Sequence, residues 1–169
     1  DLLLTEALTF PGVRSIARLL QLRLQGLAMD AEGLLPDAFE SACRQGSAKA
    51  VYCIPSIQNP TGSVMPAARR QAIAEIAERH GVAIIEDDVY GELVFDGSRP
   101  RPVKSYATED VILLSSVSKT LAPGYRVGWI AGGKFHDQIV RLKFSQSLAC
   151  PPLLEMAIAE FLSSGGYDR

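Results

Sequence analysis

Short apolar runs alternate with longer segments of helical periodicity along almost the whole chain. The apolar runs predict strands at residues 2–5, 27–29, 50–54, 82–85, 111–114 and 127–131. The segments between them predict helices at 11–24, 34–44, 66–80 and 135–161, the last of which is broken at Pro151 and Pro152. Residues 97–102 predict a surface loop. This alternation predicts an α/β fold, a three-layer sandwich in which helices cover both faces of a mostly parallel sheet.

Polar residues follow three of the predicted strands, at the end where an open α/β sheet binds ligands. Asn59 begins an Asn-Pro-Thr-Gly run after the third predicted strand. Asp87 and Tyr90 come just after the fourth strand, and Lys119 follows the fifth. Because the carboxyl ends of parallel strands lie at one edge of a sheet, we expect these four side chains to gather there.

Lys119 carries the most specific chemistry of the sequence. It follows the hydroxyls of Ser116 and Ser118 and precedes Arg126 by seven positions. A lysine so placed can form a Schiff base with the aldehyde of pyridoxal 5′-phosphate (PLP), and it can later act as a base on the α-carbon of a substrate. The two serines and the arginine can hold the phosphate by charge-assisted hydrogen bonds. We expect Lys119 to be partly buried near Arg126.

Three further residues at the same edge fit this cofactor. Asp87 would face the ring nitrogen and keep it protonated, so that the ring can accept electrons. Tyr90 and Asn59 would hydrogen-bond the phenolic oxygen of the ring. The sequence therefore predicts a PLP site whose substrate or effector is an amino acid or another amino compound.

Each motif also has a simpler interpretation when it is taken alone. Asn-Pro-Thr-Gly is often only a turn, Ser-x-Ser can cap a helix, and Lys119 and Arg126 can be surface cations. For Glu86 and Asp88, a solvated acidic loop explains the sequence at least as well as a direct role. Occurring together in this order, each after a strand, the motifs favour the cofactor hypothesis.

The same motifs resemble the ordered signature of fold-type I PLP-dependent enzymes, the aspartate-aminotransferase-like class I and II aminotransferases. The resemblance rests on Asn59-Pro-Thr-Gly, Asp87-x-x-Tyr90 and Ser116-x-Ser118-Lys119 with Arg126. It covers essentially the whole chain and implies the large domain of a PLP-dependent transferase. It also implies that Phe10 stacks on the cofactor ring, in a position where the family often has tyrosine.

Two stretches, residues 26–34 and 54–61, are similar to one branch of this family. That branch is the aminotransferase-like domain of MocR-type regulators in the GntR family, which join a DNA-binding winged helix to a ligand-sensing domain. The resemblance implies that residues 1–169 are the central part of the large domain. A phosphate-binding loop and a winged helix would precede it, and a small domain with a substrate-binding arginine would follow it. It further implies a homodimer that binds DNA only through the missing N-terminal domain.

Three functions stay open at this level. The first is a regulatory domain that binds PLP on Lys119 and senses an amino compound or the cofactor itself. The second is a free-standing aminotransferase, which moves an amino group from an amino acid to a 2-oxo acid. The third is a decarboxylase, lyase or synthase on the same fold, because a fold does not fix a reaction.

The composition indicates which classes of binding partner and which cellular compartment suit this protein. Of the 169 residues, 47% are hydrophobic, and the formal net charge is −2, which argues against nucleic-acid binding by this segment itself. No apolar run is long enough to cross a membrane. Cys43, Cys53 and Cys150 lack metal-binding spacing and predict reduced thiols in a cytoplasmic protein. The isolated His80 and His136 predict helix-end residues and no metal site.

Overall fold

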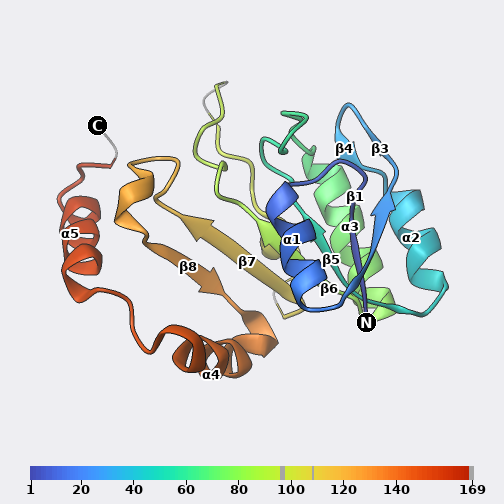
Figure 1. The fold of residues 1–169 in the computed structure, drawn as a ribbon. Coiled ribbons are helices and arrows are strands. Elements are labelled where there is room, and N and C mark those ends of the chain that lie inside the picture. The colour runs from blue at the N-terminus through green and yellow to red at the C-terminus, as the bar shows by residue number, and fades with distance from the viewer. Residues whose placement is uncertain (96–97, 108, 168–169) are drawn as a thin grey trace.

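A single sheet of mostly parallel strands organises the protein, and the computed structural model describes residues 1–95, 98–107 and 109–167 (Figure 1). The strands of this sheet are β1 (Leu2–Glu6), β2 (Arg23–Leu27), β5 (Ala48–Cys53), β6 (Ala83–Asp87), β7 (Val111–Ser116) and β8 (Gly128–Ala131). Their order is β2-β1-β5-β6-β7-β8. Neighbouring strands are parallel from β2 to β7, and β8 is antiparallel to β7. A separate hairpin pairs β3 (Met29–Asp30) with β4 (Gly33–Leu34).

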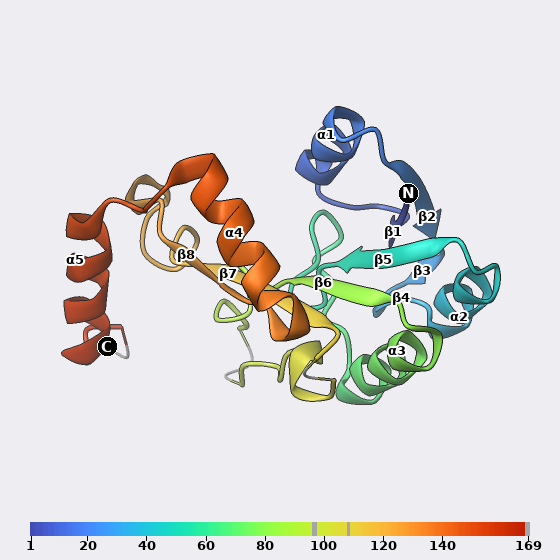
Figure 2. The same ribbon diagram turned by 90° about the horizontal axis from the view of Figure 1, so that it is seen from below.

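Helices cover both faces of this sheet (Figure 2). One face carries α1 (Pro11–Leu19), and the other carries α2 (Pro36–Arg44) and α3 (Ala67–His80). After β8 come α4 (His136–Ser147) and α5 (Pro152–Ser163), with α5 at the end of the molecule opposite α2. Single 3-10 turns form η1 (Val103–Ser105), η2 (Pro123–Tyr125) and η3 (Gly133–Phe135). The predicted α/β fold is therefore confirmed.

Each face of the sheet has its own apolar core. The larger core contains Phe39 of α2 and Ile73 of α3, both fully buried, together with strand residues. In the smaller core, Val13 of α1 packs with Tyr52 and neighbouring apolar side chains. Because successive strand residues point to opposite faces, Tyr52 and the adjacent Cys53 belong to different cores.

The predicted helix 11–24 is wrong in its second half, because it ends at Leu19. Gln21 adopts a left-handed conformation with φ of 55°. The N–H of Leu22 then donates to a carbonyl oxygen five residues back (2.8 Å), which closes the end of the helix. The chain continues as β2 beside β1. The predicted strand 27–29 is consequently divided between the end of β2 and the start of β3.

The other predicted helices and strands are confirmed with small shifts at their ends. The helical stretch 135–161 contains α4 and α5, separated as predicted before the proline pair. Strand β6 continues to Asp87, so the acidic run begins inside a strand instead of after it. Of the predicted loop 97–102, Gly97 lies outside the described residues, and residues 98–102 contain neither helix nor strand.

Several isolated residues lie where the sequence suggests. His80 is the last residue of α3, and His136 is the first residue of α4. Cys43, Cys53 and Cys150 are free thiols, and the first two are buried. Within the described ranges, no helix combines the length and apolar character that crossing a membrane requires.

Replacing Phe39 by alanine tests the larger core. The ring is fully buried, so we expect F39A to lower the free energy of unfolding by about 3–5 kcal/mol through the cavity that it leaves. F95A removes the same ring from a fully exposed position and should change that free energy by less than about 0.5 kcal/mol. Urea unfolding measures both values, and equal losses would contradict this assignment of the core.

Candidate functional site

Four neighbouring parallel strands, β1, β5, β6 and β7, end at the same edge of the sheet. Every residue of the predicted site ends one of these strands or follows it closely. In chain order these residues are Phe10 after β1, Asn59 after β5, Asp87 and Tyr90 at and after β6, and Ser116, Ser118, Lys119 and Arg126 at and after β7. The topology thus gathers the predicted residues along one edge, while their individual roles stay predictions.

The carboxylate of Asp87 is bonded on one oxygen only. Tyr52 Oη donates a hydrogen bond of 2.5 Å to Asp87 Oδ2. The other oxygen, Oδ1, is buried and has no hydrogen-bond partner among the described residues. Because buried acceptors are nearly always paired, Oδ1 is suited to accept from a donor that the described residues do not supply. A protonated pyridine nitrogen is a donor of this kind.

Other unpaired polar atoms lie at the same edge. Glu6 Oε1 at the end of β1, Thr9 Oγ1 in the following loop and Thr120 Oγ1 beside Lys119 are all buried without a hydrogen-bond partner in the described part of the chain. Such atoms are few in folded proteins, and each one in a native structure needs an explanation. Asp88 Oδ1, just past the end of β6, and His80 Nε2, at the end of α3, are also buried without a described hydrogen-bond partner. All of these atoms except His80 Nε2 belong to residues at or just after the carboxyl ends of β1, β6 and β7, where a bound group could supply the missing partners.

The sheet fixes the position of the tyrosine that bonds Asp87. Tyr52 is paired in register with Ile85, so that Asp87, two residues further along β6, projects from the same face. Burial and the negative charge of Asp87 raise the pKa of Tyr52 above its ordinary value of 10. The hydroxyl therefore keeps its proton and remains a donor to the carboxylate.

The connection between β7 and β8 carries the predicted phosphate-binding residues. The N–H of Ser118 donates to Ser116 Oγ (3.3 Å). The N–H of Val117 donates to Val127 O (3.2 Å), which joins the two ends of the connection. Arg126 has a left-handed backbone (φ 55°), and its Nη1 donates to a backbone carbonyl in η2 (3.3 Å). The two serines and the arginine therefore lie in one short, closed segment.

Lys119 is exposed, which corrects the expectation that it is partly buried. The chain leaves the sheet after Ser116, and the described residues leave the lysine side chain open to solvent. Lys119 Nζ lies 5.6 Å from the centroid of the Tyr90 ring, within the range of a cation–π contact. Since Tyr90 packs against the smaller core, the position of its ring in this contact is fixed by that packing.

A buried carboxamide links the first two loops of the edge. Gln58 Nε2 donates to Glu6 Oε2 (3.0 Å) and to a backbone carbonyl of the β1 loop (2.7 Å). Gln58 Oε1 accepts from the N–H and the hydroxyl of Thr61 (2.9 and 2.8 Å). These bonds fix the loop of Asn59 against the loop of Phe10. Asn59 is partly buried, and Phe10 is 44% exposed.

Glu86 and Asp88 are buried, so the interpretation as a solvated acidic loop is wrong. Glu86 accepts hydrogen bonds from two backbone N–H groups of η1 (2.7 and 2.9 Å). Asp88 accepts one from the guanidinium of Arg99 (2.5 Å). Burial raises the pKa of Glu86 to about 7. Because β6 extends to Asp87, Glu86 projects from the opposite face and belongs to the structural interior.

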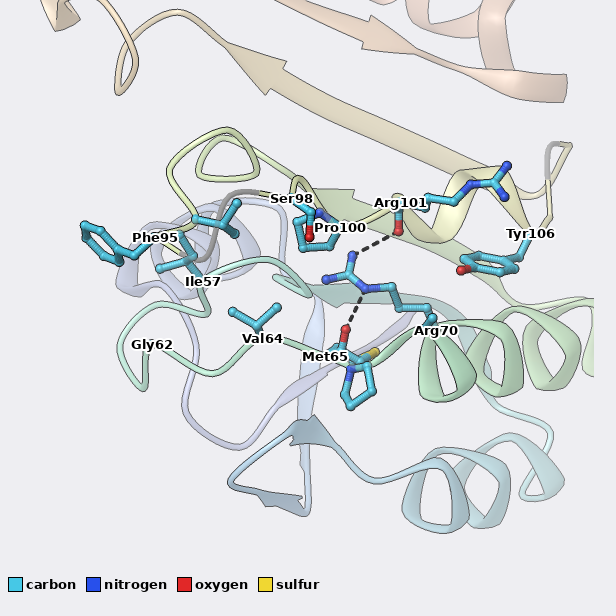
Figure 3. Close-up of a pocket in the computed structure, with 13 residues that line it drawn as sticks. Ile57, Gly62, Val64, Met65, Arg70, Phe95, Ser98, Pro100, Arg101 and Tyr106 are labelled. Atoms are coloured by element: carbon cyan, nitrogen blue, oxygen red, sulfur yellow. Dashed lines mark hydrogen bonds between the residues drawn. The ribbon is translucent and has the colours of Figure 1, made fainter.

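A cavity of about 530 Å³ lies beside the N-terminus of α3 (Figure 3). Its lining is mainly apolar and includes Ile57, Val64 and Phe95. The buried Arg70 borders it and donates to Met65 O and Pro55 O (2.7 Å each), to Arg101 O (3.3 Å) and to Ser56 Oγ (3.2 Å). These acceptors occupy the guanidinium, and none of the predicted site residues is among the described residues of the lining. Arg70 is therefore a structural residue.

The sequence alone does not single out Tyr52, Gln58 or Arg70. Tyr52 resembles any other apolar strand residue until the register of β5 and β6 is known. Gln58 precedes Asn59 in a polar loop, and its position directly before the Asn-Pro-Thr-Gly motif is its one signal in the sequence. Arg70 follows Arg69 on a helix, where a pair of cations ordinarily indicates a solvated face.

The fold described above is that of the aminotransferases. The family model for aminotransferase class I and II matches residues 1–163, so the chain belongs to that family. The structure of LysN, an α-aminoadipate aminotransferase from Thermus thermophilus complexed with N-(5′-phosphopyridoxyl)-L-leucine, has a TM-score of 0.94 and 31% identity. The match covers 99% of this chain and 44% of that one.

Curated relatives include both regulators and enzymes. The HTH-type transcriptional regulator YjiR of Escherichia coli (strain K12) is 37% identical over 171 residues, which cover 100% of this chain and 36% of that protein. Aminotransferase swnA of Metarhizium robertsii is 40% identical over 148 residues, which cover 79% of this chain and 30% of that protein. The chain thus spans about a third of the length of these relatives.

The buried Glu6 predicts that stability falls as pH rises. Burial raises the pKa of Glu6 from 4.5 to about 7, against the hydrogen bonds from Gln58 and Ile54. Between these two values the folded state holds a proton that the unfolded state has released. Stability is therefore complete below about pH 4.5 and is lost as pH rises through 7.

Glu6→Gln should remove part of this loss. We expect urea unfolding to give a difference in unfolding free energy between pH 5 and pH 8 that is about 2 kcal/mol smaller than in the wild type. Some pH dependence should remain, since the pKa of Glu86 is also raised. Glu75→Gln, at an exposed position of α3, is the control and should leave the difference unchanged. An unaltered pH dependence in E6Q would contradict the assignment.

Proposed function

We propose that this chain is the central part of a large domain that binds PLP as a Schiff base on Lys119. The observation that carries the proposal is the buried, unpaired Oδ1 of Asp87, at the sheet edge that Lys119 and Arg126 also share. When bound, PLP supplies an electron-withdrawing ring that stabilises negative charge on the α-carbon of an amine. The match to the aminotransferase family supports this cofactor.

In this proposal, residues of the chain itself bind the cofactor, orient it and transfer the proton. Lys119 would bind the cofactor aldehyde and move a proton at the α-carbon of the amine. Asp87 Oδ1 would accept the hydrogen bond of the ring nitrogen and keep its proton there. Tyr90 and Asn59 would donate to the phenolic oxygen of the ring, and Phe10 would stack on its face.

The phosphate would lie at the connection between β7 and β8. Ser116 and Ser118 offer hydroxyl donors, and Arg126 offers an exposed guanidinium with a single described hydrogen bond. Charge-assisted bonds of this type are about twice as strong as neutral ones. These three residues would hold the cofactor phosphate at this edge.

We further propose that the whole protein is a MocR-type regulator of the GntR family, in which this domain senses an amino compound or the cofactor. Support comes from regulators that match essentially the full chain, YjiR of Escherichia coli and YisV of Bacillus subtilis. In this proposal the protein is a cytoplasmic homodimer, and a winged helix outside these residues binds the DNA. An open reading frame without a winged helix upstream would contradict it.

The second candidate is a free-standing aminotransferase. It is favoured by the identity with aminotransferase swnA and by the likeness to LysN. Every site position within this chain is also filled by a residue that can perform the chemistry. Turnover of an amino donor to its 2-oxo acid would favour the enzyme, and a lasting cofactor band without turnover would favour the sensor.

Lys119→Ala tests the cofactor assignment. The full-length protein mixed with PLP should show the visible absorbance of a Schiff base, and K119A should lose it because the imine forms on this lysine. Since Lys119 is exposed, the unfolding free energy should change by less than about 0.5 kcal/mol. Absorbance and urea unfolding measure the two quantities.

A second lysine provides the matched control. Lys49 is exposed near the start of β5, at the opposite edge of the sheet, so K49A should retain the band. A band that persists in K119A would contradict the role of Lys119. A wild-type protein without any band would contradict the cofactor itself.

A further inference from the structure

The hydroxyl of Tyr52 is unusual for its surroundings. The side chain is 5% exposed in a core of apolar residues such as Leu3, Val13 and Ile54. A phenylalanine would fill the same space, whereas a buried hydroxyl costs free energy unless it is hydrogen-bonded. The described hydrogen bond of this hydroxyl goes to Asp87 Oδ2 at 2.5 Å. Packing in the apolar core therefore accounts for an aromatic ring at this position, and the hydrogen bond to Asp87 accounts for its hydroxyl.

We propose that Tyr52 is a positioning residue, whose hydroxyl holds the Asp87 carboxylate so that Oδ1 is left for the cofactor ring nitrogen. This inference deepens the proposed function and rests on it. Tyr52 itself is not expected to touch the cofactor.

The position of the donor is fixed by the fold. The ring of Tyr52 is part of the smaller core, and the parallel register of β5 and β6 fixes its position along the strands relative to Asp87. Because Tyr52 keeps its proton, Asp87 must accept at Oδ2. Oδ2 is thereby bonded inside the protein, and Oδ1 is the oxygen left without a described donor. A carboxylate held at one oxygen presents the other in a defined place.

A second buried carboxyl group close to Asp87 makes this donor more important. The charge of Asp87 adds to the cost of ionising Glu6 at the end of β1. An ionised Asp87 is needed to keep the proton on the cofactor ring. The hydrogen bond from Tyr52 stabilises that charge, and above about pH 7 it does so against the repulsion of the ionised Glu6.

Tyr52→Phe in the full-length protein loaded with PLP tests the proposal. Loss of a hydrogen bond to a charged group should raise the apparent Kd for PLP about tenfold. With Asp87 less well stabilised as an anion, the ring nitrogen holds its proton less firmly. The pH midpoint of the Schiff-base absorbance should then rise by about half a pH unit. Because phenylalanine keeps the packing of the ring, the variant should retain its fold.

A double-mutant cycle separates positioning from a general structural effect. In a D87A background, Y52F should change neither the Kd nor the midpoint further, because Tyr52 acts through Asp87. Tyr106→Phe is the matched control. It removes the hydroxyl of a partly buried tyrosine that borders the cavity beside α3, and it should leave both quantities unchanged.

The outcomes distinguish this inference from the function on which it rests. A wild-type Schiff-base band together with wild-type Kd and midpoint in Y52F would overturn the role of Tyr52 and leave the proposed function standing. Equal effects of Y52F with and without D87A would overturn it in the same way. A wild-type protein that shows no band would overturn the proposed function, and the inference with it.

Discussion

The parallel pairing of β1, β5, β6 and β7 is the constraint on which the rest of the structure depends. It brings four carboxyl ends to one edge, where the predicted site residues follow the strands. It also determines which side chains face each other across neighbouring strands. A slip of β6 by one residue would put Glu86 or Asp88 in the place of Asp87 beside Tyr52 and turn Asp87 to the opposite face of the sheet.

Buried charged groups are hydrogen-bonded to different extents on the α3 side of the sheet and at the carboxyl edge of its strands. On the α3 side, Glu86 and Arg70 are bonded to backbone groups and lie 4.0 Å apart, so these charges are used within the fold. At the edge itself, Asp87 and Glu6 each keep one buried oxygen without a partner among the described residues. Charged groups whose hydrogen bonds are satisfied internally serve the fold, whereas partly satisfied ones are suited to a ligand.

Much of the fold could be predicted because its signals are local. Apolar runs and helical periodicity indicated the elements, and the motifs after the strands indicated the edge where Asn59, Asp87 and Lys119 lie. The end of α1 could not be predicted, because Gln21 adopts a left-handed conformation without a glycine to mark it. The burial of Glu86 and the partnership of Tyr52 with Asp87 depend on strand register, which pairs distant residues. The exposure of Lys119 likewise depends on which other segments pack against its loop, and the local sequence does not specify those contacts.

Chemical trapping tests the central claim most directly. The full-length protein would be incubated with PLP, reduced with borohydride to fix any Schiff base, digested and analysed by peptide mass spectrometry. The account predicts a phosphopyridoxyl group on Lys119. A label on another lysine, such as Lys49 or Lys143, or no label at all, would contradict the assignment of this edge as the cofactor site.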